Sequence, residues 1–394
     1  MLQNKHILVG ITGGIAAYKI PEFVRLLKKA GAEVRVCCTR NALQFVTPLV
    51  LETLSNNKVY TDVFAPHNEH ETEHISLPDW ADLMIVAPCT ANMAGKMACG
   101  IADDALSTTF LAMRKPVLVA PAMNEGMLLH PAVQRNLHTL ASFPHVTVLD
   151  CDEGFLACGT TGKGRMPEPA VLLEATDSLL EEKTLAGTRV LITAGPTQEK
   201  IDPVRFISNY SSGKMGYALA RLCKRKGATV TLVSGPTDLC FEGGETIQVN
   251  SAQEMRDATV SRFSEADITI LSAAVADFTP ESAAEHKIKQ KNGLTLSLRP
   301  TADIAAELGR MKRPGQLLAG FALETDNEQE NALGKMEKKN FDLIVLNSLR
   351  DAGAGFGCDT NKITVFTRNG SPLSFPLKPK EEVARDILTC IERL

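Results

Sequence analysis

Short apolar segments alternate with helical segments along the whole chain, and the turns between them are rich in glycine and hydroxyl residues. In the first half, the segments typical of buried parallel strands are residues 6–11, 33–39, 83–87 and 116–120. The second half repeats this rhythm at residues 190–193, 229–234, 267–272, 317–321 and 343–346. Strands that alternate with helices predict a doubly wound parallel sheet.

The length of 394 residues exceeds what one hydrophobic core usually supports, so we expect two domains. A charged connector at residues 181–187 separates the two series of strands, and we place the boundary near residue 184. The predicted fold class is therefore α/β, with two doubly wound Rossmann-like domains at residues 1–183 and 184–394.

Composition limits the partners that the protein can have. The net charge of −4, the hydrophobic content of 44% and the charged content of 22% are those of a soluble globular protein, with no support for nucleic-acid or membrane binding. The apolar run after Lys5 is broken by Thr12, two glycines and Lys19, so it is too polar for a signal peptide and too short to span a bilayer. We expect a cytoplasmic protein whose ten cysteines, Cys158 excepted, are mostly buried thiols.

A glycine turn, Gly-Ile-Thr-Gly-Gly-Ile-Ala-Ala-Tyr-Lys at residues 10–19, joins the first strand to a helix. It lacks the G-x-G-x-x-G order of dinucleotide sites, and Thr39 begins a Thr-Arg-Asn run where such sites carry an acidic residue. Hydroxyl and amide side chains suit a mononucleotide phosphate better than a ribose diol. The turn alone is equally consistent with a purely structural role.

Polar loops follow the third and fourth strands, with Thr90 and Asn92 in the first loop and Asn124 in the second. Ligands of open α/β sheets bind beyond the carboxyl ends of the strands, so these side chains are candidate ligand contacts. Alternatively, they cap the helices that follow. His74 ends a loop rich in His and Glu, whose irregular spacing disfavours a metal site.

Cys158 lies in the middle of a glycine-rich segment, residues 154–167, close to Lys163 and Arg165. Glycines allow such a segment to move, and neighbouring cations activate a thiol. The pattern predicts a mobile lid that carries an acid over a site.

The second half has its own anion-binding sequence, Arg-Phe-Ile-Ser-Asn-Tyr-Ser-Ser-Gly-Lys-Met-Gly at residues 205–216, which opens a helix. Backbone N–H groups at a helix start, with Arg205 and Lys214, make a site for phosphate or carboxylate. Asn209 can both donate and accept hydrogen bonds there. Farther along, Lys335 and Lys339 share one helix face and could jointly meet a polyphosphate.

Two further motifs in this region are incomplete and do not indicate a P-loop or a dehydrogenase. Met215 stands where a P-loop has its magnesium-binding Ser or Thr. Tyr210 and Lys214 have the spacing of the Tyr/Lys pair of short-chain dehydrogenases, but no dinucleotide glycine motif accompanies them.

Taken in order, several motifs resemble one family, the bacterial bifunctional phosphopantothenoylcysteine decarboxylase fused to phosphopantothenate–cysteine ligase, which acts in coenzyme A biosynthesis. The motifs are the glycine turn, H-I-x-L at His74, A-P-x-T-A-N, P-A-M-N, L-A-C-G with G-R-M, T-A-G-P-T, I-S-N-x-S-S-G-K-M-G, A-A-V-A-D and the lysines after it. The chain departs from the family at Leu128, where Trp is common, and after Lys287, where Lys289-Gln290 lacks a further basic residue.

For the first half, the resemblance implies a flavodoxin-like flavoprotein domain and an FMN-dependent decarboxylase. His74 would assist oxidation and decarboxylation, Asn124 would hold the substrate carboxylate, and Cys158 would protonate the product on the lid. The implied FMN contacts are Gly13, Gly14, Thr39, Thr90 and Asn92.

For the second half, the resemblance implies a ligase that activates 4'-phosphopantothenate with CTP as an acyl-cytidylate, which the amine of cysteine then attacks. Lys287 would serve formation of the acyl-cytidylate, Asp277 would hold Mg²⁺ with CTP, and Asn209 would stabilise the intermediate beside Arg205. The implied nucleotide contacts are Ala273, Asp277, Asp303, Phe321, Lys335 and Lys339.

The resemblance also implies a homo-oligomer in which the flavin domains form trimers and the ligase domains form dimers. Two alternatives remain. The chain could be a flavoprotein that only transfers electrons or binds a partner, or a dehydrogenase that uses Tyr210 and Lys214.

Overall fold

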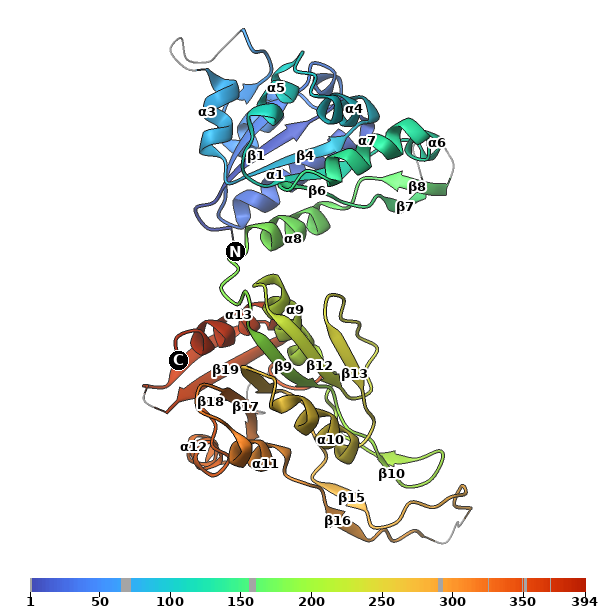
Figure 1. Cartoon of the computed structure of the whole chain (residues 1–394), viewed down its shortest axis with the longest axis vertical. Coiled ribbons are helices and arrows are strands. Elements are labelled where there is room, and N and C mark those ends of the chain that lie inside the picture. The colour runs from blue at the N-terminus through green and yellow to red at the C-terminus, as the bar shows by residue number, and fades with distance from the viewer. Residues whose placement is uncertain are drawn as a thin grey trace. The chain divides into compact units, whose positions relative to one another are not determined.

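A computed structural model describes residues 2–64, 72–155, 161–289, 293–324, 326–348, 350, 353–368 and 370–394. The chain divides into two compact units, Met1–Glu181 and Glu182–Leu394. Each unit has one large open sheet with helices on both of its faces (Figure 1). Among the residues just given, no helix is long and apolar enough to cross a membrane.

The sheet of the first unit is entirely parallel, with the order β3-β2-β1-β4-β5-β6. Its strands are β1 (His6–Ile11), β2 (Glu33–Cys38), β3 (Val59–Tyr60), β4 (Leu83–Cys89), β5 (Val117–Pro121) and β6 (Val146–Val148). Without the two-residue edge strand β3, the order is 2-1-3-4-5, that of flavodoxin-like sheets; with it, the order is that of the Rossmann fold. In both descriptions the winding reverses between β1 and β4.

Helices cover both faces of this sheet because each has one apolar stripe. On one face lie α1 (Ile20–Lys29), α2 (Pro48–Ser55) and α8 (Pro169–Leu180), which bury Phe23, Leu51 and Leu172. On the other face lie α3 (Glu73–Trp80), α4 (Ala91–Cys99), α5 (Ala105–Ala112) and α7 (Pro131–Ala141). The shorter elements are η1 (Ile15–Lys19), η2 (Ala42–Gln44), α6 (Glu125–Leu128), β7 (Asp152–Phe155) and β8 (Thr161–Arg165).

The sheet of the second unit has the order β13-β12-β9-β14-β17-β18-β19-β20. The strands β9 (Arg189–Ala194), β12 (Thr229–Ser234), β13 (Glu245–Gln248), β14 (Ile268–Leu271), β17 (Leu317–Glu324) and β18 (Leu343–Ser348) are parallel. They repeat the Rossmann order, with the reversal between β9 and β14. An antiparallel pair, β19 (Thr360–Thr367) and β20 (Leu373–Pro379), extends the sheet.

Two helices, α9 (Lys214–Arg225) and α13 (Lys380–Ile391), cover one face of the second sheet. The opposite face carries α10 (Ala252–Phe263), α11 (Ile304–Met311) and α12 (Glu328–Lys338). Two small ladders project from the body of the unit: β10 (Glu199–Lys200) with β11 (Phe206–Ile207), and β15 (Phe278–Pro280) with β16 (Leu298–Pro300) (Figure 1). We call residues 198–208 and 278–300 the arm.

The prediction of two doubly wound α/β units is confirmed. Helix α5 begins at Ala105 rather than earlier in the loop after Gly100. The reason is a capping box, in which the Ser107 N–H donates to Asp104 Oδ1 (2.8 Å) and the Asp104 N–H donates to Ser107 Oγ (3.1 Å).

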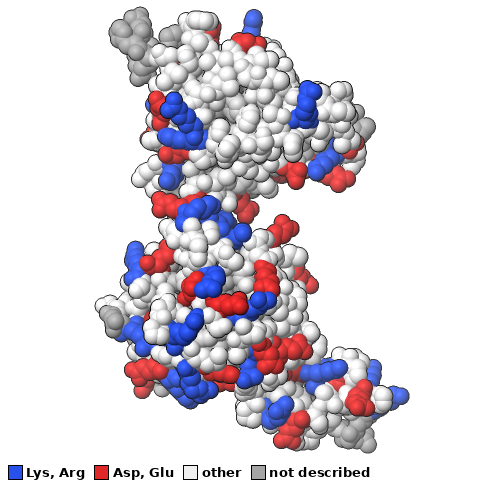
Figure 2. Space-filling model, viewed as in Figure 1, with Lys and Arg blue, Asp and Glu red and all other residues white. Residues whose placement is uncertain are grey.

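On the face shown in Figure 2, basic and acidic side chains of the second unit lie next to one another.

Candidate active sites

The glycine turn of the first unit lies where β1, β2 and β4 end. A Cβ atom at Gly13 would lie 2.5 Å from Asn41 Cβ, and one at Gly14 would lie 3.3 Å from Thr90 Cγ2. Glycine therefore lets the turn pass close to the loops after β2 and β4. This is the point where the winding of the sheet reverses, the usual ligand site of such folds.

Two threonines strengthen this edge of the sheet. Thr39, half-buried after β2, accepts the Ala42 N–H at its Oγ1 (3.3 Å). Thr12, which the sequence analysis did not select, is buried; its Oγ1 donates to the Pro88 carbonyl (2.6 Å) and accepts the Thr90 N–H (3.1 Å). The sequence could have indicated Thr12, because this hydroxyl residue lies between the first strand and the two glycines of the turn.

The predicted ligand contacts Thr90 and Asn124 both cap helices. Thr90 Oγ1 accepts the Met93 N–H (3.4 Å) at the start of α4, and Asn124 Oδ1 accepts the Gly126 N–H (2.9 Å) at the start of α6. These bonds orient the two side chains at the carboxyl edge of the sheet. Asn92 is exposed in the first turn of α4.

The glycine-rich segment, expected to be a mobile lid, is a β-hairpin in its described part. Strands β7 and β8 pair, and the hairpin packs on the Asn124 loop through the Met123 N–H, which donates to the Gly164 carbonyl (3.0 Å). A Cβ atom at Gly164 would lie 2.2 Å from the Met123 carbonyl oxygen. This glycine therefore allows the two backbones to approach closely, and the mobile lid stays a prediction. Cys158 lies between the two strands in sequence, outside the described residues.

His74 lies in the first turn of α3, not in a loop as expected. Its Nδ1 is buried, with no hydrogen-bond partner in the described part of the chain. That His74, Asn124 and the glycine turn meet in one site stays a prediction. Within the same residues, no group of three or more His, Cys, Asp or Glu side chains could hold a metal ion.

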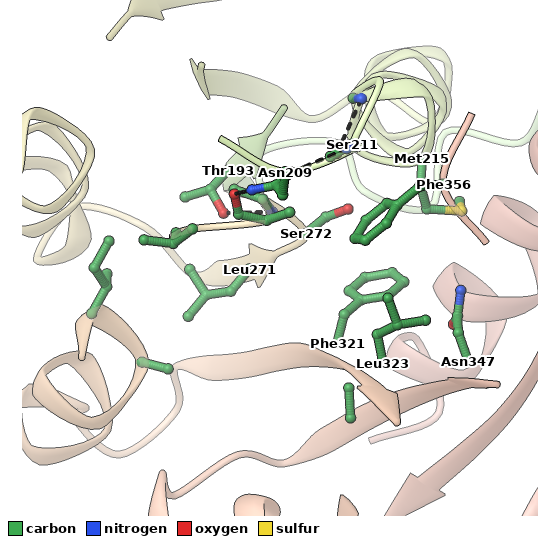
Figure 3. Close-up of a pocket in the computed structure, with 18 of the residues that line it drawn as sticks. Thr193, Asn209, Ser211, Met215, Leu271, Ser272, Phe321, Leu323, Asn347 and Phe356 are labelled. Carbon is green, nitrogen blue, oxygen red and sulfur yellow. Dashed lines mark hydrogen bonds between the residues drawn. The ribbon is translucent and has the colours of Figure 1, made fainter. Parts of the chain in front are cut away.

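A pocket of about 600 Å³ lies in the second unit at the carboxyl ends of β9, β14 and β17 (Figure 3). Its lining includes most of the residues predicted for the second half, namely Asn209, Ala273, Asp277, Asp303, Phe321, Lys335 and Lys339. Arg205 and Lys287 are not part of the lining. They lie on the arm, where the side chain of Lys287 is exposed.

Three motifs far apart in sequence converge on this pocket. Asn209 Nδ2 donates to the Ala274 carbonyl (2.6 Å), and its Oδ1 accepts the Ser211 N–H (3.0 Å). Thr197 Oγ1 accepts the Ala276 N–H (3.0 Å). The T-A-G-P-T, I-S-N and A-A-V-A-D motifs therefore support one another's backbone, and the amide group of Asn209 is held at the pocket wall.

The start of α9 also faces the pocket, because residues 213–216 line it. Gly213 precedes the helix with a φ of 75°, a left-handed conformation that glycine adopts without strain. A Cβ atom at Gly216 would lie 2.6 Å from Ala194 Cβ, so the helix starts directly against the turn after β9. The free N–H groups of this first turn make a site for an anion.

Lys335 and Lys339 line the same pocket, but each is already paired with a carboxylate. Lys335 Nζ lies 2.6 Å from Glu324 Oε1, and Lys339 Nζ lies 3.1 Å from Asp303 Oδ1. Burial on its own would raise the pKa of Asp303, but the Ala306 N–H and Lys339 outweigh it and lower that pKa. A polyphosphate at this site has to compete with both carboxylates.

Sequence reasoning missed Lys380, a buried pocket residue at the start of α13. Its Nζ donates to the carbonyls of Gly355 (3.1 Å) and Cys358 (2.5 Å), and burial lowers its pKa. No motif surrounds Lys380, so the sequence carried no signal for it.

In the same region Phe356 points toward Phe321 across the cavity (Figure 3).

The Tyr/Lys pair of a dehydrogenase is not formed. Tyr210 is 91% exposed, and Lys214 Nζ lies 2.6 Å from Asp359 Oδ1 instead. Lys214 nevertheless lines the pocket, which supports its reading as a cation beside the anion site.

Two family models match the chain. Residues 1–181 match the family described as Flavoprotein. Residues 185–394 match the family described as DNA/pantothenate metabolism flavoprotein C-terminal domain.

Curated relatives match over nearly their whole length. The chain is 48% identical over 400 residues to the coenzyme A biosynthesis bifunctional protein CoaBC of Bacillus subtilis (strain 168), covering 100% of this chain and 98% of that protein. The protein of the same name from Haemophilus influenzae is 43% identical over 396 residues, with 100% and 98% covered. A cysteine/cysteine sulfinic acid decarboxylase from an unknown prokaryotic organism is 52% identical over 351 residues, with 87% and 98% covered. The resemblance inferred from the motifs is confirmed, and the chain belongs to the family of coenzyme A biosynthesis bifunctional proteins.

Proposed function

We propose that this enzyme of coenzyme A biosynthesis makes 4'-phosphopantetheine from 4'-phosphopantothenate and cysteine in two stages. Residues 184–394 act as a CTP-dependent phosphopantothenate–cysteine ligase, and residues 1–183 act as an FMN-dependent phosphopantothenoylcysteine decarboxylase. The observation that carries the proposal is the pocket of the second unit, where three motifs and the start of α9 meet Lys214, Lys335 and Lys339. The proposed boundary falls between the two family matches, which end at 181 and begin at 185.

In the ligase stage, a carboxylate oxygen of phosphopantothenate attacks the α-phosphorus of CTP, and diphosphate leaves. The amine nitrogen of cysteine then attacks the acyl carbon and loses a proton, and CMP leaves. Backbone N–H groups at the start of α9 and the pocket lysines stabilise the negative charges of this chemistry. The amide of Asn209, fixed by Ala274 and Ser211, holds the acyl-cytidylate.

Asp277 fits a Mg²⁺ site shared with CTP. Its side chain is exposed at the pocket lining, and its backbone carbonyl accepts the Thr301 N–H (3.0 Å). Mg²⁺ is commonly held by one or two carboxylates together with substrate phosphates. Bound there, the ion would neutralise phosphate charge.

The edge of the first sheet fits FMN, because the turn at Gly13 and Gly14 is only half-buried and carries no side chain, so a phosphate can approach its backbone beside Thr39 and Thr90. When bound, FMN supplies the electron acceptor that cysteine decarboxylation needs, and it returns the electrons afterwards. The residues of the chain act on the substrate around it.

Three side chains carry the substrate chemistry of the first unit. The amide of Asn124 binds the substrate carboxylate. His74, whose buried Nδ1 has no partner in the described residues, accepts a proton. Cys158 donates one to the decarboxylated product.

We further propose a cytoplasmic homo-oligomer with trimeric flavin units and dimeric ligase units. Its substrates are small molecules, and CTP is available in the cytoplasm. Analytical ultracentrifugation of the whole protein tests the assembly; a monomer at all concentrations would contradict it.

The test of function is incubation of the purified protein with phosphopantothenate, cysteine, Mg²⁺ and either CTP or ATP, with products followed by mass spectrometry. We expect phosphopantetheine with CTP alone. Accumulation of phosphopantothenoylcysteine without loss of CO₂ would support the proposed ligase activity and refute the proposed decarboxylase activity.

A second candidate function comes from the relative named as a cysteine/cysteine sulfinic acid decarboxylase. Incubation with cysteine alone distinguishes it. Cysteamine formed without phosphopantothenate would favour a decarboxylase of the free amino acid, whereas no product supports the phosphopantothenoyl substrate.

A further inference from the structure

A buried carboxylate, Asp202, lies in the turn of the arm between β10 and β11, with an exposed fraction of 1%. Its Oδ1 accepts the N–H groups of Val204 (2.8 Å) and Arg205 (2.9 Å). Its Oδ2 accepts Arg205 Nε (2.9 Å), Arg205 Nη2 (2.5 Å) and the Ile288 N–H (3.1 Å). Such a densely bonded buried carboxylate needs a structural or functional reason.

These hydrogen bonds include the backbone of Ile288, the residue that follows Lys287 in the sequence. The N–H of Ile288 donates to Asp202, and its carbonyl accepts Arg205 Nη2 at 2.7 Å. Both backbone polar groups of Ile288 are thus held by one ion pair, although Arg205 and Ile288 are 83 residues apart. A further bond, from the Ala284 N–H to the Ile201 carbonyl (2.8 Å), ties the same segment to the same turn.

The charge of Asp202 is secured by these contacts. The Arg205 guanidinium and the backbone N–H groups of Val204, Ile288 and Arg205 hold the pKa of this carboxyl well below its usual range, against the opposing effect of burial. The carboxylate is therefore ionised at physiological pH. Only the carboxylate of this pair is buried, since the Arg205 side chain is 41% exposed. Replacing the carboxylate would leave the Arg205 guanidinium and the Ile288 N–H without their charged acceptor, which makes the clamp sensitive to a single substitution at Asp202.

We propose that Asp202 is a positioning residue of the ligase, which orients Lys287 by clamping Arg205 and the backbone of Ile288. The inference rests on the proposed function of Lys287 in forming the acyl-cytidylate. A lysine side chain is long and flexible, so its reach is set by where its backbone is anchored. Lys287 itself is exposed, and the anchor closest to it in sequence is the one on Ile288.

The test compares Asp202→Asn with a matched control, Asp267→Asn, in the full chain. Asp267 also accepts a bidentate bond from an arginine, with Arg189 Nη2 at 3.0 Å and Arg189 Nε at 3.2 Å, but it lies where β9 and β14 begin, at the end of the sheet opposite the pocket. We expect Asp202→Asn to lower kcat for diphosphate release roughly 10²-fold, the scale of a misplaced catalytic group. Asp267→Asn should leave it within about twofold.

A double variant distinguishes a positioning role of Asp202, exerted through Lys287, from a general effect of Asp202 on protein stability. If Asp202 acts through Lys287, adding Asp202→Asn to Lys287→Gln should cause little further loss of diphosphate release. Losses that multiply in the double variant, or an unchanged rate in Asp202→Asn alone, would overturn the proposal. Decarboxylation of supplied phosphopantothenoylcysteine should be equal in wild type and in all the variants, which shows that the first unit is unaffected. Thermal denaturation of the second unit, which carries Asp202, reports whether that unit is folded.

Hydrogen exchange tests the clamp without ligase activity. In Asp202→Asn, peptides covering residues 284–289 should exchange faster than in wild type and in Asp267→Asn. Unchanged exchange would refute the clamp. A wild-type protein that shows the protection but does not ligate would instead refute the proposed function, so the two failures are distinguishable.

Discussion

Asn209 Nδ2 donates to the carbonyl oxygen of Ala274 at 2.6 Å, across 65 residues of sequence. The bond joins the loop before α9 to the end of β14, on either side of the point where the winding of the second sheet reverses. It fixes the orientation of the amide, since only the NH₂ group can donate to a carbonyl. The side chain predicted to hold the acyl-cytidylate is thus held in place by the site itself.

Changing Asn209 to Asp should make the acyl-cytidylate accumulate. A carboxylate cannot donate to the Ala274 carbonyl and is repelled by it, so the pocket wall loses its anchor while the lysines that serve the first step remain. We expect the cysteine-dependent step to slow by about 10²-fold. Mass spectrometry of quenched reactions checks this.

The matched control for that variant is Asn57→Asp in the first unit, where Asn57 Nδ2 likewise donates to a carbonyl, that of Val34 (2.9 Å). It should ligate normally. Absence of the acyl-cytidylate in Asn209→Asp, with normal ligation, would remove this residue from the mechanism.

Replacing Lys335 with Met should weaken CTP binding and also destabilise the second unit. Glu324, whose side chain is 13% exposed, would lose its ion pair with Lys335 Nζ at 2.6 Å and keep the longer hydrogen bond from Asn331 Nδ2 at 3.3 Å. Because Lys335 is itself 43% exposed, we expect a loss of only about 1 kcal/mol in the free energy of unfolding.

The double variant Lys335→Met/Glu324→Gln separates these two effects. It should recover most of the lost stability but keep the raised KM for CTP. Recovery of the CTP affinity as well would show that the lysine serves the fold alone. Thermal denaturation and initial rates at varied CTP supply the two measurements.

Alanine at Gly13 should yield protein with little bound flavin. Its Cβ would lie 2.5 Å from Asn41 Cβ, so the turn and the loop after β2 must separate at the proposed FMN edge. The absorbance spectrum of the purified protein gives the flavin content. Gly334→Ala is the control, since nothing lies within 4 Å of its added Cβ, and a full flavin complement in both variants would argue against this edge.

The stability contributed by Asp104 should depend on pH. Burial alone would raise its pKa, but Lys96 at 2.7 Å and the N–H and O–H groups of Ser107 outweigh burial and lower the pKa from 3.8. A carboxyl group with a lowered folded-state pKa contributes stability above the unfolded value, and that contribution disappears as the pH falls through the folded value.

Asp104→Asn keeps a good helix cap but loses the charge. Wild type should therefore exceed this variant in stability by about 1 kcal/mol near pH 7, and the difference should shrink below pH 3.8. Denaturant unfolding at several pH values, followed by a probe in the first unit, measures it. A difference that is constant with pH would mean that the ion pair contributes nothing.

The alternation of apolar segments and helices was enough to predict the central parallel strands of both sheets, because buried parallel strands are continuous apolar runs whatever they pack against. It did not predict the edge strands β3, β6 and β13 or the antiparallel pair β19 and β20. The arm could not be predicted in this way. Its strands β10, β11, β15 and β16 have two or three residues each, too few to show a period, and they exist only because their partners come from distant parts of the chain.

The motifs likewise named most residues of the second pocket. Only the tertiary structure decided what those residues contact. It paired Lys335 with Glu324, and it placed Lys287 on the arm beside the Asp202 clamp rather than in the pocket lining. It also brought in Lys380, which no motif marks. Side-chain chemistry and short-range periodicity are properties of the sequence, whereas burial, ion pairing and hydrogen bonds between distant residues arise only when the chain folds.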